Sequence, residues 1–119
     1  MNYPWLDEYL CAKTGAVKEY KLEWECFRYM LAGKMFAMVG ADNHGKSIVT
    51  LKMLPENGAI LRAQHQDIVP GYYMNKEHWN SVFLDGSVPD EVLRAMADES
   101  HRLILGALPK KLQQQLQQE

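Results

Sequence analysis

The chain of 119 residues is 47% hydrophobic and 24% charged, with a formal net charge of −2. This length fits one domain and this composition is that of a globular protein, which argues against extensive disorder and a second core. The slight acidic balance argues against a general polyanion-binding protein. No apolar run approaches the roughly 20 residues of a membrane-spanning helix, and the N-terminus lacks the features of a signal peptide, so we expect a cytoplasmic protein with no membrane partner.

The N-terminal segment predicts a helix over residues 2–14, with Asn2 as its cap and Gly15 as its stop. One side of this helix is apolar at helical spacing, and we expect it to pack in the core. That side consists of Trp5, Leu6, Tyr9 and Leu10. A short strand is then expected around residues 18–22.

Three consecutive strands follow, in the segments CFRYMLAG, KMFAMVGA and GKSIVTLKML. Residues on the two faces alternate in the first and third, which predicts one buried face and one face at least partly in contact with water. Gly33 in the short first connection predicts a tight hairpin. The longer second connection offers Asn43 and Gly45 for positive φ angles. Two hairpin tips are therefore expected, with Lys34 on one and Lys46 on the other.

The second half of the chain predicts a short helix that begins at Pro55 and buries Ile60 and Leu61. Two strands are expected next, in the segments DIVPGYYM and HWNSVFLD. A long helix, which follows a capping box at Ser87, ends near Leu108. The residues beyond it are polar and rich in glutamine, and their sequence is compatible with a last helix.

This order of helix, three strands, helix, two strands and helix indicates an α+β fold of two layers. We expect an antiparallel sheet of about five to six strands, with helices packed on one face and the other face open. Residues 1–108 would form the single domain and residues 109–119 a tail. Alternation along the strands predicts that the open face presents Arg28, Met30, Lys52 and Phe36.

No catalytic or metal-binding pattern stands out in the sequence. The histidines have none of the spacings of known zinc sites, and Cys11 and Cys26 fit two reduced, packed thiols. The serines lack a GxSxG motif. Residues 40–47, GADNHGKS, match the letters of a phosphate-binding P-loop, but the β-branched segment that follows predicts a strand where a P-loop needs a helix. We therefore expect a hairpin loop there, no cofactor and no enzyme activity.

Binding is the remaining class of function, and the basic residues are concentrated in one part of the chain. Residues 26–54 hold four basic residues against one acidic residue. Tyr72, Tyr73 and Trp79 would add base stacking to contacts with phosphates. The alternative is that these aromatics pack in the core, and we expect Trp79 to do so, with His78 on the opposite face of its strand. The candidate nucleic-acid contacts are Arg28, Lys34, Lys46, Lys52, Lys76 and His78.

Four segments, in their order and spacing, resemble the MmcQ/YjbR family of small bacterial proteins: FRYMLAGKMFAMV, VTLKMLPE, GYYMNKEHWNSVFLDGSVPDE and DESHRLI. The resemblance runs from the first helix to about Leu108. It implies an α+β fold related to the frataxin-like and type III secretion chaperone-like architectures, and a DNA-binding function through a double-wing motif. The two wings would match the hairpins around Gly33–Lys34 and Asn43–His44–Gly45.

Two functions follow from these residues and this resemblance. The first is a non-enzymatic protein that binds DNA weakly, through salt-sensitive contacts with phosphates. The second is a protein- or peptide-binding module on the open sheet face, and burial of Met30, Phe36 and Tyr73 together beneath the helices would argue against it. The frataxin-like shape also raises iron binding, but lysines dilute the acidic residues of the N-terminal region, so no metal is expected.

Overall fold

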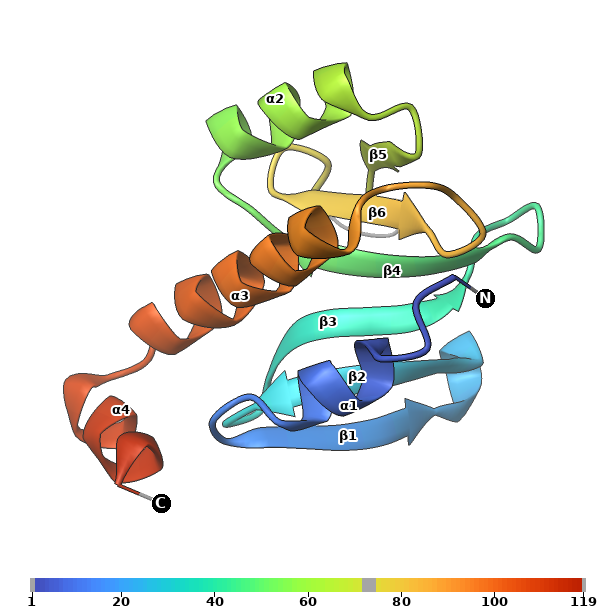
Figure 1. Cartoon of the computed structure of the whole chain (residues 1–119). Helices are drawn as coiled ribbons and strands as arrows, with labels where there is room; N and C mark the ends of the chain where they lie inside the picture. The colour runs from blue at the N-terminus through green and yellow to red at the C-terminus, as the bar shows by residue number, and fades with distance from the viewer. Residues whose placement is uncertain (1, 72–74, 119) are drawn as a thin grey trace.

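The computed structural model describes residues 2–71 and 75–118, which form a sheet layer and a helix layer (Figure 1). The strands are antiparallel and lie side by side in the order β1-β2-β3-β4-β6-β5, which confirms the expected α+β class. They are β1 (Ala16–Lys21), β2 (Cys26–Leu31), β3 (Lys34–Ala41), β4 (Ser47–Lys52), β5 (Ile68–Pro70) and β6 (Trp79–Phe83). The helices are α1 (Leu6–Cys11), α2 (Pro55–Gln64), α3 (Asp90–Gly106) and α4 (Lys110–Gln117), with a 3-10 turn η1 at Leu22–Trp24.

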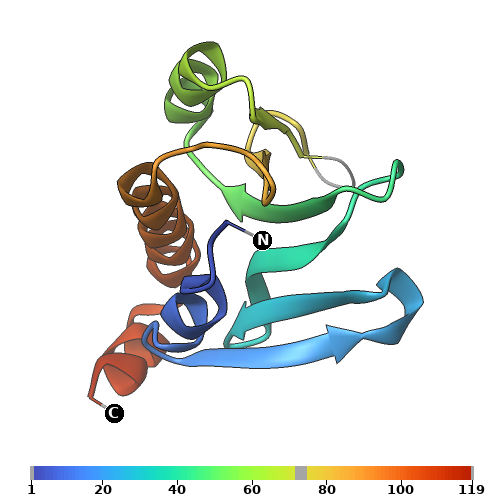
Figure 2. The ribbon, with the colours of Figure 1, turned by 45° about the vertical axis from the view of Figure 1, so that its right-hand side comes forward.

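The core lies between the sheet and the helices, which Figure 2 shows on one side of the strands. Alternate strand residues face the helices, so Tyr29 and Leu31 of β2 and Val49 and Leu51 of β4 are buried together. The helices contribute apolar residues at helical spacing. These are Leu6 and Leu10 of α1 and Leu93, Met96, Ala97 and Ile104 of α3.

Phe36 belongs to this core and is fully buried, so its expected place on the open face is wrong. The register of β2 and β3 shifts between Tyr29 and Met30, which leaves Phe36 as an extra residue in β3. A bulge of this kind re-aims a side chain, and here it turns Phe36 toward α3. The ring meets His101 of α3 edge to face, with centroids 5.1 Å apart.

The two expected helix caps are not the ones that the structure uses. Helix α1 is shorter than expected, and Asn2 instead donates its side-chain amide to the Gly86 carbonyl. Helix α3 begins after Pro89 without a side-chain cap. Ser87 donates its backbone N–H to the Asp67 carboxylate at 2.9 Å. Both polar residues therefore fasten the loop before α3 to distant segments rather than capping a helix.

Helix α2 packs on the sheet through a glycine rather than through the expected isoleucine. Ile60 is exposed, Leu61 is half-buried, and Gly58 is the buried residue of the helix. A Cβ atom on Gly58 would lie 2.9 Å from the Asn80 amide nitrogen, so the close approach of α2 to β6 requires glycine. Glycine destabilises the helix relative to alanine, but it allows α2 to pack directly against the sheet.

The hairpins of strands β1 to β4 alternate between the two ends of the sheet (Figure 1). Ala32 and Gly33, with φ of 50° and 79°, form the two-residue turn between β2 and β3 that was expected. In the β3–β4 loop Gly45 has a φ of 79°, whereas Asn43 does not adopt a positive φ. The β1–β2 and β3–β4 connections lie together at one end, and the β2–β3 turn lies at the other.

Residues 110–117 fold as α4, whose Leu112 and Leu116 pack against the core cluster. Gly15, with a φ of 73°, lies beneath Leu116: a Cβ atom on it would be 3.0 Å from a methyl group of that leucine. This contact joins the end of the chain to the loop before β1. Among the residues that the structure describes, no helix combines the length and the apolarity needed to cross a membrane.

Candidate functional site on the open face of the sheet

The face of the sheet opposite the helices, called the open face below, carries the strand residues that alternate with the core residues. Ala37, Val39, Val49 and Leu51 face the helices, so their strand neighbours point the other way. The cross-strand pairs on the open face are Arg28 with Met38, Gly40 with Ile48, Thr50 with Ser81, and Lys52 with Trp79.

Two hydroxyl groups occupy the middle of the open face. Thr50 and Ser81 are buried, and their hydroxyl oxygens lie 2.7 Å apart in a hydrogen bond across β4 and β6. This bond gives each hydroxyl oxygen a partner, so two polar groups can lie among apolar neighbours.

A hollow of about 440 Å³ lies beside this pair, and we call it the cationic hollow. Its floor is apolar and includes Ile48 and Phe83, while His44 of the β3–β4 loop and Lys76 stand on its wall. Lys46 lies beside it, with Nζ 5.2 Å from the centroid of the Phe83 ring. The other lining residues are Asp42, Val69, Pro70, Gly71 and Ser81.

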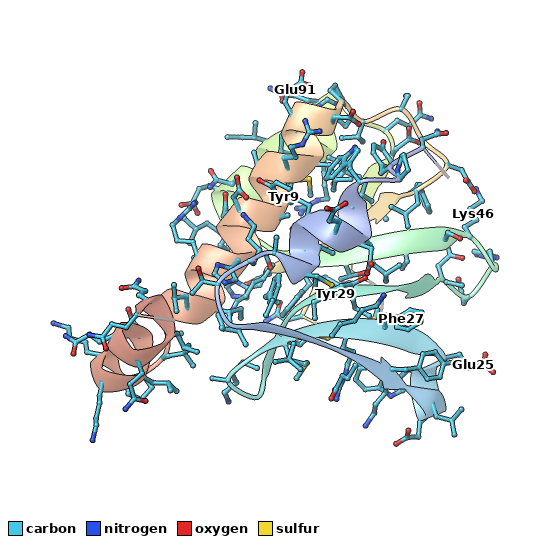
Figure 3. All side chains as sticks on the ribbon, turned by 60° about the horizontal axis from the view of Figure 1, so that its bottom comes forward. Tyr9, Glu25, Phe27, Tyr29, Lys46 and Glu91 are labelled. Carbon is cyan, nitrogen blue, oxygen red and sulfur yellow. The ribbon has the colours of Figure 1, made fainter. Side chains whose placement is uncertain are left out.

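Asp42 supplies the carboxylate that lines the cationic hollow, and this carboxylate accepts hydrogen bonds from the backbone of its own loop. Its Oδ1 accepts the backbone N–H groups of His44 and Lys46, each at 2.9 Å. These hydrogen bonds, that of Lys46 first, hold the pKa of Asp42 below its ordinary value. The carboxylate thus shapes the hairpin that presents the side chains of His44 and Lys46 (Figure 3, where Lys46 is labelled).

A second hollow of about 440 Å³ is lined by residues of η1, β2 and β3, and we call it the tryptophan hollow. Trp24, at the end of η1, is 52% exposed over it. The Arg28 guanidinium carbon and the Lys21 Nζ each lie 5.5 Å from the centre of the Trp24 ring system. Its lining residues are Glu23, Trp24, Cys26, Met38, Gly40 and Ala41.

Sequence reasoning did not single out Trp24. The segment KLEWE has no clear period, so alternation could not assign its tryptophan to a face. The available signal was an aromatic residue among charged residues next to a turn. Glu25 closes that turn with a φ of 51°, and this left-handed residue sets the direction in which β2 leaves.

The structure separates five of the six candidate contact residues into three places. Lys76 lines the cationic hollow, and Lys46 lies beside it over the Phe83 ring. Arg28 lies on the open face as expected, but it pairs with the Glu19 carboxylate of β1. Lys52 is on the same face at the far end of β4, and Lys34 lies on the β2–β3 turn at the opposite end from Lys46.

Trp79 does not lie where the sequence predicted, and the backbone of His78 is hydrogen-bonded to Met53. Trp79 pairs with Lys52 on the open face and is half-buried, so its expected place in the core is wrong. The register puts it there because its strand neighbour Asn80 faces the helices and is fully buried. The carbonyl of His78 accepts the Met53 backbone N–H at 2.7 Å. Tyr72 and Tyr73 lie outside the described residues.

A polar cluster on the helix side is separate from the open face. Asp7 Oδ1 accepts hydrogen bonds from the Tyr29 hydroxyl and from Lys18 Nζ, each at 2.7 Å. The Lys18 ammonium and then the Tyr29 hydroxyl lower the pKa of Asp7, whereas burial raises the pKa of Tyr29. Within the described ranges, no three His, Cys, Asp or Glu side chains gather as a metal ion would need.

Comparisons with known proteins agree with this architecture. A family model described as YjbR matches residues 11–103. The uncharacterized protein YjbR of Escherichia coli K12 is 35% identical over 104 residues, which cover 87% of each chain. The uncharacterized protein YyaQ of Bacillus subtilis 168 is 38% identical over 66 residues, or 55% of each chain. The crystal structure of Deinococcus radiodurans DR2400, a DUF419 domain, has a TM-score of 0.82 at 29% identity, covering 93% of this chain and 84% of that one.

Proposed function

The chain belongs to the YjbR family, and we propose that it is a non-enzymatic protein that binds DNA weakly through phosphate contacts on the open face of its sheet. The contacts would centre on the cationic hollow. The proposal concerns binding without chemistry. Lys76 and His44 line the hollow beside apolar side chains, while its carboxylate, Asp42, accepts loop amides and its hydroxyl, Ser81, is hydrogen-bonded to Thr50.

The observation that carries the proposal is that His44 and Lys76, from two separate segments, line one hollow, with Lys46 beside it over the Phe83 ring. Neither lysine pairs with a carboxylate anywhere in residues 2–71 and 75–118. The backbone amides of the loop already engage Asp42, so its charge is partly balanced. Unpaired cations at an open surface are the groups that neutralise DNA phosphates and release the counterions condensed on them.

Arg28 and Lys52 extend this surface along the same face. Arg28 keeps its partner Glu19, so it adds less positive charge than an unpaired arginine would. Lys52 has no carboxylate partner within the described ranges, and it lies toward the other end of β4. The acidic total charge of −2 predicts weak binding that disappears with salt.

The test is the salt dependence of duplex DNA binding for matched pairs of lysine variants. We expect Lys46→Gln with Lys76→Gln to weaken binding and to lower the slope of log K against log salt by about 2, since two phosphate contacts are lost. Lys34→Gln with Lys110→Gln removes the same charge from exposed positions away from the hollow, and should leave most of the slope intact. Equal effects of the two pairs, or no salt-sensitive binding at roughly 100 µM protein, would contradict the proposal.

A second candidate function, a protein- or peptide-binding module, is favoured by the apolar residues at the β1–β2 end of the sheet. Of the three residues whose joint burial would argue against this function, Phe36 is buried, Met30 is half-buried and Tyr73 lies outside the described residues. Other apolar side chains are exposed instead, namely Val17, Tyr20, Leu22, Trp24 and Phe27. Apolar peptides should then bind with little salt dependence, and Leu22→Ala should weaken them; failure of both would remove this candidate.

A further inference from the structure

We propose that Trp24 is a stacking platform for an unpaired DNA base, so that the open face prefers single-stranded DNA to a closed duplex. This inference rests on the proposed DNA-binding function and names the form of DNA. In a duplex the faces of the bases are covered by their neighbours, whereas in a single strand they are free to stack on an aromatic side chain.

The first step is the presentation of the Trp24 ring. The ring is 52% exposed at the edge of the tryptophan hollow, and the hollow provides room on the sheet side for a planar group. Arg28 and Lys21 flank the ring at 5.5 Å, so cations border the site at which a nucleotide would stack. Met38 and Cys26 give the hollow an apolar, polarizable lining.

The second step is the position of this hollow next to the cationic hollow. Gly40 lines the tryptophan hollow, Ile48 lines the cationic hollow, and the two residues are a cross-strand pair of β3 and β4. Neighbouring strands lie about 4.8 Å apart, so the linings of the two hollows adjoin across β3 and β4. Figure 3 shows Glu25, next to Trp24 in the chain, at the same end of the molecule as Lys46.

The third step is the division of roles between the hollows. Lys21 pairs with Glu23 at 3.4 Å, and Arg28 pairs with Glu19, so the charges around Trp24 are largely balanced. The lysines at the cationic hollow have no such partners within the described ranges. Trp24 would therefore add affinity through stacking, while Lys46 and Lys76 supply the salt-dependent contacts with phosphates. Stacking and phosphate contacts can therefore be measured separately, because only the phosphate contacts depend on salt.

The experiment compares three DNAs of about 12 nucleotides: a single strand, its duplex, and an abasic single strand that keeps the phosphates. We expect the wild-type protein to bind the single strand most tightly. Trp24→Ala should weaken single-strand binding about ten-fold, leave the abasic strand and the duplex unchanged, and keep the salt slope. Trp24→Phe should retain most of the single-strand affinity, because a phenyl ring still stacks.

Tyr20→Ala is the matched control, because Tyr20 is 51% exposed on the same hairpin but faces the helix side with Phe27. It should leave binding of all three DNAs unchanged. Equal affinity of the wild-type protein for the three DNAs would overturn the inference and leave the proposed function standing. Loss of apolar-peptide binding in Trp24→Ala, with unchanged single-strand binding, would also overturn it and assign Trp24 to a protein partner. No salt-sensitive binding of any DNA would remove both proposals.

Discussion

Gly40 of β3 packs so closely against Cys26 of β2 that a Cβ atom on the glycine would lie 2.8 Å from the cysteine Cβ. Both residues line the tryptophan hollow. The cysteine is buried, and burial raises the pKa of its thiol, so it fills space beneath the hollow as a neutral group. The depth of the hollow thus depends on the absence of a side chain at residue 40.

We therefore expect Gly40→Ala to destabilise the protein by about 1–3 kcal/mol, because the new methyl group must displace a strand of the sheet. Gly106→Ala is the matched control, since nothing lies within 4 Å of a Cβ atom there. The control should change stability by less than about 1 kcal/mol. Urea unfolding of both variants measures the difference. A Gly40→Ala protein as stable as the control would show that the sheet yields freely at this position.

Ser100→Ala should destabilise the protein by about 1–3 kcal/mol, because two buried backbone groups lose their partner. The Ser100 hydroxyl accepts the Lys52 N–H at 2.8 Å and donates to the Phe36 carbonyl at 2.5 Å, so it joins α3 to the β3 bulge. Ser47→Ala is the control, since no hydrogen bond of its hydroxyl is seen within the described ranges. A change below about 0.5 kcal/mol for Ser100→Ala, measured by urea unfolding, would contradict this role.

The contribution of Asp7 to stability should depend on pH. Hydrogen bonds from Lys18 and Tyr29 lower its pKa in the folded state, so folding favours the ionised carboxylate. This stabilisation is fully present above the ordinary Asp pKa of about 3.9 and is lost as pH falls through the lower folded-state value. Asp7→Asn should therefore be less stable than the wild type near about pH 6, and the two should converge toward about pH 3. A difference in unfolding free energy that stays constant with pH would argue against this linkage.

Leu116→Ala should weaken the attachment of α4 to the rest of the protein. Leu116 packs over Gly15 and the core, so its truncation removes buried apolar surface worth about 1 kcal/mol. Amide exchange in residues 110–117 should become faster, while exchange in α3 stays slow. Gln117→Ala, at an exposed position of the same helix, is the control. Unchanged exchange in Leu116→Ala would show that another contact holds the helix.

Much of the fold could be predicted from sequence because its signals are local. Alternation in β2 and β4 placed Arg28 and Lys52 correctly on the open face, and helical spacing in the N-terminal segment placed Leu6 and Leu10 correctly in the core. Phe36 was misplaced because the bulge inserts one residue, and a shift of one residue exchanges the two faces of a strand. The position of the bulge depends on how β2 pairs with β3, so it cannot be predicted from the sequence of β3 alone.

The candidate site was less accessible to sequence reasoning, because it depends on which distant segments meet. Lys46 and Lys76 were named on charge alone. Only the folded chain places Lys76 in the lining of the cationic hollow and Lys46 beside it, while Lys34 lies at the far end of the sheet. Gly58 has a low helix propensity, yet the close contact of α2 with Asn80 requires a residue without a side chain there. These contacts join residues that are far apart in the sequence, so neither the distribution of charge nor the periodicity of a segment predicts them.

The order of strands in the sheet also bears on how the protein reaches its native state. Strands β1 to β4 are neighbours in the same order as in the chain, and the connections between them are short. Such pairings close small loops, so they lose little chain entropy before contacts form. We expect residues 16–52 to pair early, with the tight turn at Ala32 and Gly33 as their most local step, and β6 and α3 to dock later. Pulsed amide exchange during refolding would reveal this sequence as early protection confined to the first four strands.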